Sequence, residues 1–238
     1  MAILSKEQIF KRLSQPVSKG SSLVISPLLQ AKDAFDADSV DLRLGTHFLL
    51  PQAPPQPYFY PGSGSSKLGY QRVHIPLGRY LVVPAHETVL GATLEFIKLP
   101  NDASGQILTK SSVARTFVVI ETAPWIHPSY RGCLTLEIAN VSNTPLLLYP
   151  GRLVAQLILF DAQQPSSILK QSGTYLAPVY PEAPVFRDPK DDLAAIGVAQ
   201  TDEPKVKTRA TARCPTCLTK VAPSTTRCTF CKAVPTPS

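Results

Sequence analysis

The chain has 238 residues, 24 of them proline, and a formal net charge of +7 at pH 7. That length suffices for one large domain, or for one domain with an appendage, and so many prolines exclude an architecture of long helices. The sequence contains neither a signal peptide nor an apolar run that could cross a bilayer, so we expect a soluble, cytoplasmic protein without a membrane partner.

The predicted elements are one helix followed by many short strands. Residues 2–13 form an amphipathic pattern that Ser5 would cap, and a Pro/Gly/Ser-rich loop occupies residues 51–70. Short strands separated by turn signals predict an all-β sandwich or barrel that ends near Phe160. The strand-like runs cover residues 22–27, 39–50, 73–77, 79–84, 87–100, 105–110, 117–122, 132–140, 145–150 and 151–160.

One acidic residue, Glu137, interrupts an apolar strand. Strand alternation places Thr135 and Glu137 on one face and the apolar residues Leu134, Leu136 and Ile138 on the other. A solvated glutamate on a sheet surface would explain this pattern. The sequence KSSVAR at 110–115 favours another interpretation, because two cations and two hydroxyls in one short segment form an anion cradle.

The five cysteines fall into two groups. Cys133 is interpreted as a small buried hydrophobic residue. The other four form two CxxC pairs with the spacing of a structural four-thiolate zinc ribbon: Cys214, Cys217, Cys228 and Cys231. The basic excess lies here too, since residues 1–204 hold 17 basic and 17 acidic side chains and residues 205–238 hold seven basic and no acidic ones. We expect the ribbon to bind a protein, with nucleic acid as the alternative.

The KSSVAR segment, ETA at 121–123 and TLE at 135–137, read in order, resemble the dCTP deaminase branch of the dUTPase-fold superfamily. The resemblance covers about residues 2–160. It implies a distorted β-barrel or jelly roll that assembles as a homotrimer, with three active sites between subunits. We therefore expect a dUTPase-like domain over residues 1–175, a Pro-rich, basic linker over 176–212 and the zinc ribbon over 213–238.

The resemblance also implies the roles of individual residues. Glu137 would be the catalytic acid/base, and burial in the apolar strand would favour a pKa near neutral. Arg115 would lie close to the reacting base and would also bind the triphosphate. The triphosphate, with Mg²⁺, would be held by Lys110, Ser111, Ser112 and Arg115, the water would be oriented by the backbone of Thr122 and Ala123, and the base would be read by the main chain of Thr135 and Leu136.

Two positions depart from the family pattern. His127 stands where an aspartate is usual, and it would contact the sugar 3′-hydroxyl instead. Of the element that closes over the phosphates, Tyr175 remains, whereas the usual lysine and glutamine do not.

These residues predict hydrolytic deamination of dCTP to dUTP and ammonia without a catalytic metal. One alternative is a weak or inactive nucleotide-binding trimer that acts as a sensor or scaffold, and another is a bifunctional enzyme that also hydrolyses dUTP. A zinc deaminase is excluded because no histidine is followed two residues later by glutamate and because Arg213 precedes Cys214. A plain dUTPase lacks support, since residues 161–238 offer only Gly173 and Gly197 for a Gly-rich arm.

Overall fold

The computed structural model describes residues 2–29, 34–36, 38–52, 69–121, 123–162, 177–185, 212–213 and 220–221. The chain divides into two compact units, one of residues 1–49 and 73–182 and the other of residues 50–72 and 183–238. The predicted boundaries at residues 175 and 212 stay predictions. No helix in the described ranges is long and apolar enough to cross a membrane.

The predicted opening helix is present as α1, Lys6–Leu13. Ser5 caps it in a reciprocal arrangement, because the Ser5 side chain accepts from the backbone N–H of Gln8 and the Gln8 side chain accepts from that of Ser5. Ile9 is the buried residue of the helix, and Phe10 lies 4.6 Å from Phe35, measured between ring centroids. The cap and the apolar face together fix the helix against the body of the unit.

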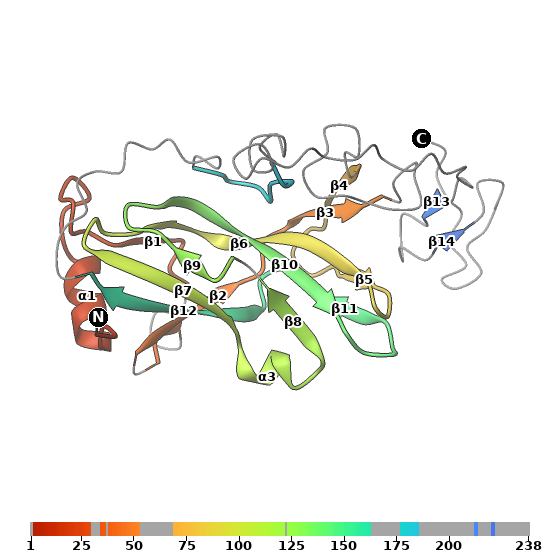
Figure 1. The fold of residues 1–238 in the computed structure, drawn as a ribbon, viewed down its shortest axis with the longest axis horizontal. Helices are drawn as coiled ribbons and strands as arrows, with labels where there is room; N and C mark the ends of the chain where they lie inside the picture. Colours follow the sequence, from red (N-terminus) through yellow and green to blue (C-terminus); the bar gives the residue numbers. More distant parts are fainter. Residues whose placement is uncertain are drawn as a thin grey trace, which may run out of the picture. The chain divides into compact units, whose positions relative to one another are not determined.

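The described strands between residues 24 and 161 are antiparallel and form two main sheets (Figure 1). The larger sheet has the order β4-β3-β6-β10-β8, and β1 also pairs with β6; the smaller has the order β2-β12-β7-β9. β5 and β11 pair separately. The bounds are β1 Val24–Ser26, β2 Ser39–Arg43, β3 His47–Pro51, β4 Tyr70–His74, β5 Leu81–Val83, β6 Thr88–Lys98, β7 Ala103–Thr109, β8 Val118–Glu121, β9 Trp125–Ile126, β10 Arg131–Asn140, β11 Leu146–Leu148 and β12 Leu153–Asp161.

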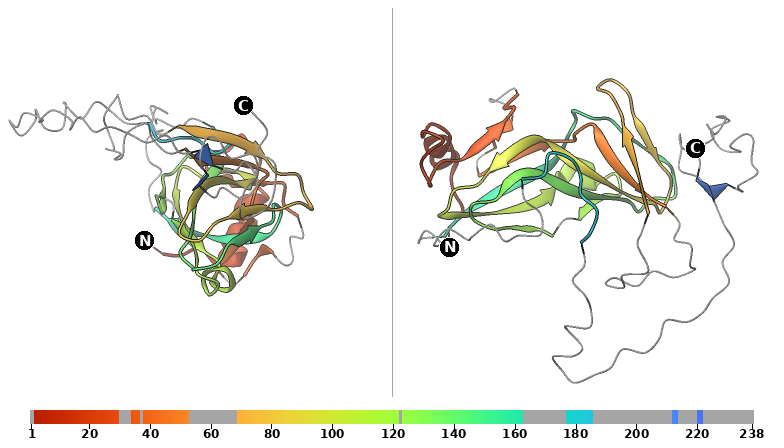
Figure 2. Two further views of the ribbon diagram at one scale, coloured as in Figure 1. Left: turned by 90° about the vertical axis from the view of Figure 1, so that its right-hand side faces the viewer. Right: turned by 90° about the horizontal axis from the view of Figure 1, so that it is seen from above.

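The core lies between these sheets, and the end-on view in Figure 2 shows the strands arranged around a shared interior. The all-β prediction is confirmed, and the described strands form separate sheets that do not close into one continuous barrel. The two-residue strand β9 was missed, since so short an element shows no periodicity. The largest fully buried side chains include Phe48, Leu42, Leu44, Leu49, Ile97, Leu99 and Leu136.

The most deeply buried acid of the described residues lies inside this core. Glu95 on β6 is only 4% exposed. Its carboxylate accepts the backbone N–H of Arg43 at 2.9 Å, which joins β6 to the end of β2. Burial raises the pKa of Glu95 to about 7, and the hydrogen bond from Arg43 opposes that rise only in part.

Replacing Glu95 by glutamine is expected to remove a pH dependence of folding. Because the pKa of Glu95 is raised in the folded protein, the folded state holds the proton more tightly than the unfolded chain does. The free energy of unfolding therefore falls as the pH rises from 4.5 through about 7. The shift corresponds to at most about 3 kcal/mol. Urea titrations near pH 5 and pH 8 measure it, and an equal pH dependence in wild type and Glu95→Gln would contradict the assignment.

Candidate active site

The KSSVAR segment forms a single helical turn at the end of β7. This turn is α3, Ser111–Ala114, and it begins directly after Lys110. The backbone N–H of Lys110 donates to Val154 of β12 at 3.0 Å, and the Lys110 carbonyl accepts from Val113 and Ala114 at 2.8 and 2.9 Å. The side chains predicted to hold phosphate are therefore displayed on one short, anchored turn. Three of them are exposed to solvent: Ser111, Ser112 and Arg115.

The fourth predicted phosphate ligand, Lys110, is already paired with an acid of the same chain. Lys110 Nζ forms an ion pair with Asp41 Oδ2 on β2, and the exposed fractions of the two side chains are 27% and 8%. The other carboxylate oxygen, Asp41 Oδ1, is buried and has no hydrogen-bond partner among the described residues. The sequence suggested no role for Asp41. An acid between the apolar residues Val40 and Leu42 was the only available signal, and alternation would have assigned it to a solvated face.

Glu137 lies on β10, and the predicted alternation is confirmed. Leu134, Leu136 and Ile138 are buried, Thr135 is half-buried and Glu137 is exposed. Glu137 is exposed among the described residues, so the apolar, water-poor surroundings expected for it are not observed there.

The register places a second acidic residue directly opposite Glu137. Glu137 pairs with Leu90 of β6 on one side and with Glu121 of β8 on the other. Glu121 is the last residue of β8, so the β8–β10 ladder runs only from Glu137 to Asn140. The pairing of β8 with β10 therefore does not include Leu136 or the residues of β10 that precede it. We call the edge of β10 from Thr135 to Glu137 the slot.

A family model of dCTP deaminase-like proteins matches residues 3–162. The chain belongs to this family. Over 165 residues it is 32% identical to the "dCTP deaminase, dUMP-forming" of Dictyoglomus thermophilum, covering 69% of this chain and 82% of the relative. Over 166 residues it is 33% identical to the dCTP deaminase of Halorubrum lacusprofundi, covering 69% and 79%. The resemblance predicted from KSSVAR, ETA and TLE is confirmed.

A solved structure supports the fold of this dCTP deaminase-like chain. The 2′-deoxycytidine 5′-triphosphate deaminase from Agrobacterium tumefaciens superposes with a TM-score of 0.50 at 24% sequence identity. The superposition covers 66% of this chain and 47% of that one, so it spans about half of the solved chain. At this identity the likeness establishes the fold and leaves the roles of individual residues open.

The remaining predicted site residues are exposed, fully buried or outside the described residues. Ala123 is exposed just beyond β8, and His127 is exposed after β9, a strand that pairs with β7 in the smaller sheet. Leu136 is fully buried, which leaves only its main chain available to a ligand at the slot. Thr122 and Tyr175 lie outside the described residues.

The predicted zinc ribbon lies beyond the family match, which ends at residue 162. Its four ligands, Cys214, Cys217, Cys228 and Cys231, are also outside the described residues. The described neighbours of the first CxxC pair do form a small hairpin: β13, Ala212–Arg213, pairs antiparallel with β14, Lys220–Val221.

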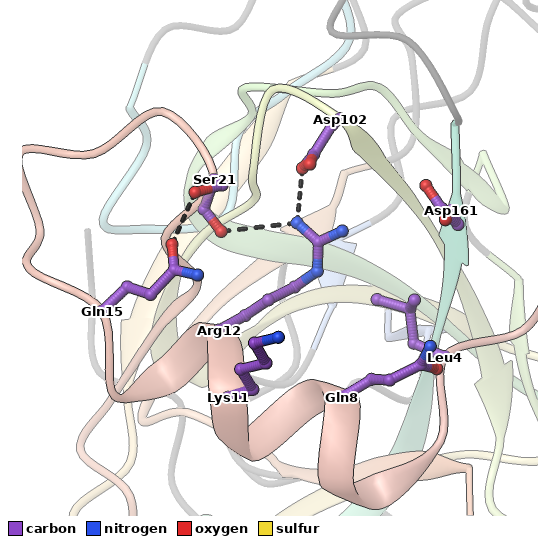
Figure 3. A pocket seen from close by; sticks show the side chains of 8 residues that line it. All are labelled: Leu4, Gln8, Lys11, Arg12, Gln15, Ser21, Asp102 and Asp161. Carbon is purple, nitrogen blue, oxygen red and sulfur yellow. Dashed lines mark hydrogen bonds and ion pairs between the residues drawn. The ribbon is translucent and has the colours of Figure 1, made fainter.

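A cavity of about 240 Å³ lies beside α1, away from all the predicted site residues (Figure 3). Arg12 crosses it and forms an ion pair with Asp102 at 2.5 Å, while the Ser21 hydroxyl donates to Gln15 at 2.5 Å. The charge of Arg12 is therefore already neutralised by Asp102 of the same chain. None of the predicted site residues lines this cavity.

Proposed function

We propose that this chain deaminates dCTP by hydrolysis, giving dUTP and ammonia, with Glu137 as general acid and base. The observation that carries the proposal is an exposed acid at the slot, in a chain that also displays Ser111, Ser112 and Arg115 on one exposed turn. An acid beside an open strand edge can reach both a bound base and a water molecule. A cluster of hydroxyls and a guanidinium suits a triphosphate.

The reaction needs one group that takes and returns protons. Glu137 would accept a proton from water as the water oxygen bonds to C4 of the cytosine, and it would deliver a proton to N3. In the second step the C4–N bond breaks, the C4 hydroxyl loses its proton, and the amine leaves as ammonia after receiving a proton. One carboxylate can serve both steps in turn, so the chemistry requires no catalytic metal.

The surroundings of Glu137 favour assembly of several chains. Both Glu137 and the turn at α3 are exposed in one chain, and proton transfer by a carboxylate near neutral pH is favoured by a site that excludes water. We propose that the chain forms a homotrimer whose three active sites lie between subunits. Each neighbour would then cover the slot, where the Glu137 side chain is exposed among the described residues.

Mg²⁺ would enter the site with the triphosphate, whose charge it would partly neutralise. The residues present fit such an ion. Asp41 Oδ1 is a buried oxygen beside Lys110 with no partner among the described residues, and carboxylate oxygens accept hydrogen bonds from the water ligands that Mg²⁺ retains. The proposed Zn²⁺ is separate and structural, and it would be held by the four ribbon cysteines for docking to a protein partner.

The names of several relatives support a second candidate, in which the same chain carries dCTP through to dUMP. The relative from Dictyoglomus thermophilum is described as dUMP-forming, whereas that from Halorubrum lacusprofundi is described only as a dCTP deaminase. A two-step enzyme needs a second water activated at the phosphates. His127 occupies the position at which the family resemblance implies a carboxylate for this purpose, and so deamination alone stays our first proposal.

Product analysis separates these functions. Metal-loaded full-length protein is incubated with dCTP and Mg²⁺, and nucleotides, ammonia and pyrophosphate are quantified; dUTP is tested in parallel as a substrate. We expect ammonia and dUTP in equal amounts. Equal amounts of ammonia, dUMP and pyrophosphate would establish the two-step reaction instead. Binding of dCTP without any product would refute catalysis and favour a sensor or scaffold.

A further inference from the structure

A short segment beyond β12 is docked on β10 next to the slot. We call residues 177–182 the strap; they are drawn in teal in Figures 1 and 2. The backbone N–H of Cys133 on β10 donates to the carbonyl of Pro178 at 2.6 Å. Two residues further along β10, the Thr135 hydroxyl accepts the backbone N–H of Glu182 at 3.2 Å. The strap thus follows the stretch of β10 that β8 does not reach.

The fit at the first contact depends on a glycine. Gly132 has a φ of +142°, and a Cβ atom built on it would lie 2.5 Å from Pro178 Cδ and 2.9 Å from the Pro178 backbone N and O atoms. No other residue type could hold this conformation with Pro178 so close. Pro178 and Pro181 are both buried, and Tyr180 packs edge-on against His47 of β3, with ring centroids 4.5 Å apart. The strap is therefore anchored along its length.

The same stretch of β10 is irregular on its other side. Its pairing with β6 shifts register between Cys133 and Thr135. The N–H of Leu134 is diverted there to the Thr93 hydroxyl, at 2.9 Å. A bulge of this kind bends the strand and leaves its backbone less constrained by the ladder. The hydrogen bonds to Pro178 and Glu182 add a constraint next to the bulge.

The strap therefore borders the slot at the end opposite to Glu121. The pairing of β8 with β10 ends at Glu121 and Glu137, and the strap contacts β10 at Thr135, so the main chain at Leu136 lies between the two. If this main chain reads the base, as the family resemblance implies, then its position is determined jointly by β8 and the strap. A displacement of this main chain by about 1 Å would disturb hydrogen bonds to the base.

We propose that the strap fixes the slot for the nucleotide base and that Thr135 is a positioning residue whose hydroxyl holds the strap. This inference rests on the proposed function, because it assigns a role to a boundary of that same site. The Thr135 hydroxyl already accepts from Glu182, so the contribution of Thr135 to base binding would come through its main chain. The strap would thus act on binding of dCTP more than on the proton transfers at Glu137.

Thr135→Val and Thr135→Ser form a matched pair that tests this role. Valine keeps the shape of threonine and removes the acceptor, whereas serine keeps the hydroxyl. In full-length protein we expect Thr135→Val to raise both the KM and the calorimetric Kd for dCTP about 10-fold, the effect of one lost hydrogen bond, with kcat within about twofold of wild type. Hydrogen exchange of the strap amides should accelerate in the same variant, and Thr135→Ser should resemble wild type in all three readouts.

Gly132→Ala provides a second way to displace the strap, since the added methyl group meets Pro178 rather than the slot. It should reproduce the rise in KM together with faster exchange of the strap. Released strap amides with an unchanged Kd would overturn the proposal, and so would a strap that stays protected in Thr135→Val. A wild-type protein that neither binds nor deaminates dCTP would refute the proposed function itself, which sets that failure apart from failure of the strap alone.

Discussion

Glu137→Gln is expected to lower kcat for dCTP deamination by about 10²–10⁴-fold, the contribution typical of a general acid/base, and to leave the Kd for dCTP nearly unchanged. The amide keeps the size of the side chain but cannot accept a proton from water. Because Glu137 is exposed on β10, the substitution should also leave the free energy of unfolding close to that of wild type.

Ammonia release under substrate saturation measures this effect, with calorimetry of dCTP binding as the companion experiment. Glu7→Gln is a suitable control, because Glu7 is an exposed carboxylate in the first turn of α1 and contributes to neither the slot nor the α3 turn. Wild-type activity in Glu137→Gln would remove Glu137 from the mechanism. A comparable loss in the Glu7 variant would show that the assay reports something other than proton transfer.

Lys110→Met is expected to destabilise the fold far more than Asp41→Asn, although the two side chains form one ion pair. Removing Lys110 leaves the Asp41 carboxylate buried without a counter-charge, which costs about 3–5 kcal/mol. Removing the charge of Asp41 instead leaves Lys110, whose side chain is 27% exposed and can turn towards water, so we expect a cost of about 1 kcal/mol.

Urea denaturation of the two single variants and of the Asp41→Asn/Lys110→Met double variant measures the asymmetry. The double variant should recover most of the stability lost in Lys110→Met, because the uncompensated buried charge is gone. Equal costs for the two single variants would contradict the burial of Asp41. The result also bears on the α3 turn, since a lysine that neutralises Asp41 contributes less positive charge to a triphosphate than Arg115 does.

Local patterns in the sequence were sufficient to predict the helix cap at Ser5 and the face of β10 on which Glu137 lies. Both depend on contacts within a few residues, which periodicity and capping rules describe. Periodicity failed at β2, where alternation would leave Asp41 solvated. There Asp41 is buried like its apolar neighbours Val40 and Leu42. The acid pairs with Lys110, which is 69 residues away along the chain.

The contacts between distant segments could likewise not be predicted from the sequence. The pairing of Glu137 with Glu121 depends on the register of β8 against β10, and the strap depends on a glycine that accommodates a proline 46 residues further on. The family resemblance supplied the names of the site residues. It did not supply the exposure of Glu137 in one chain, since a motif carries no record of what covers it.

The early end of β8 also bears on how such a site survives sequence change. β8 ends at Glu121, whereas its neighbour β10 begins at Arg131 and is longer. The position of the slot therefore follows from strand lengths and backbone spacing. Side chains that line a pocket can be exchanged one at a time, whereas a gap in a sheet is lost only if the pairing itself is rebuilt. If the slot holds the base as proposed, a chain that is 32% identical to a relative can keep this strand edge while its surface, its loops and its carboxyl end change.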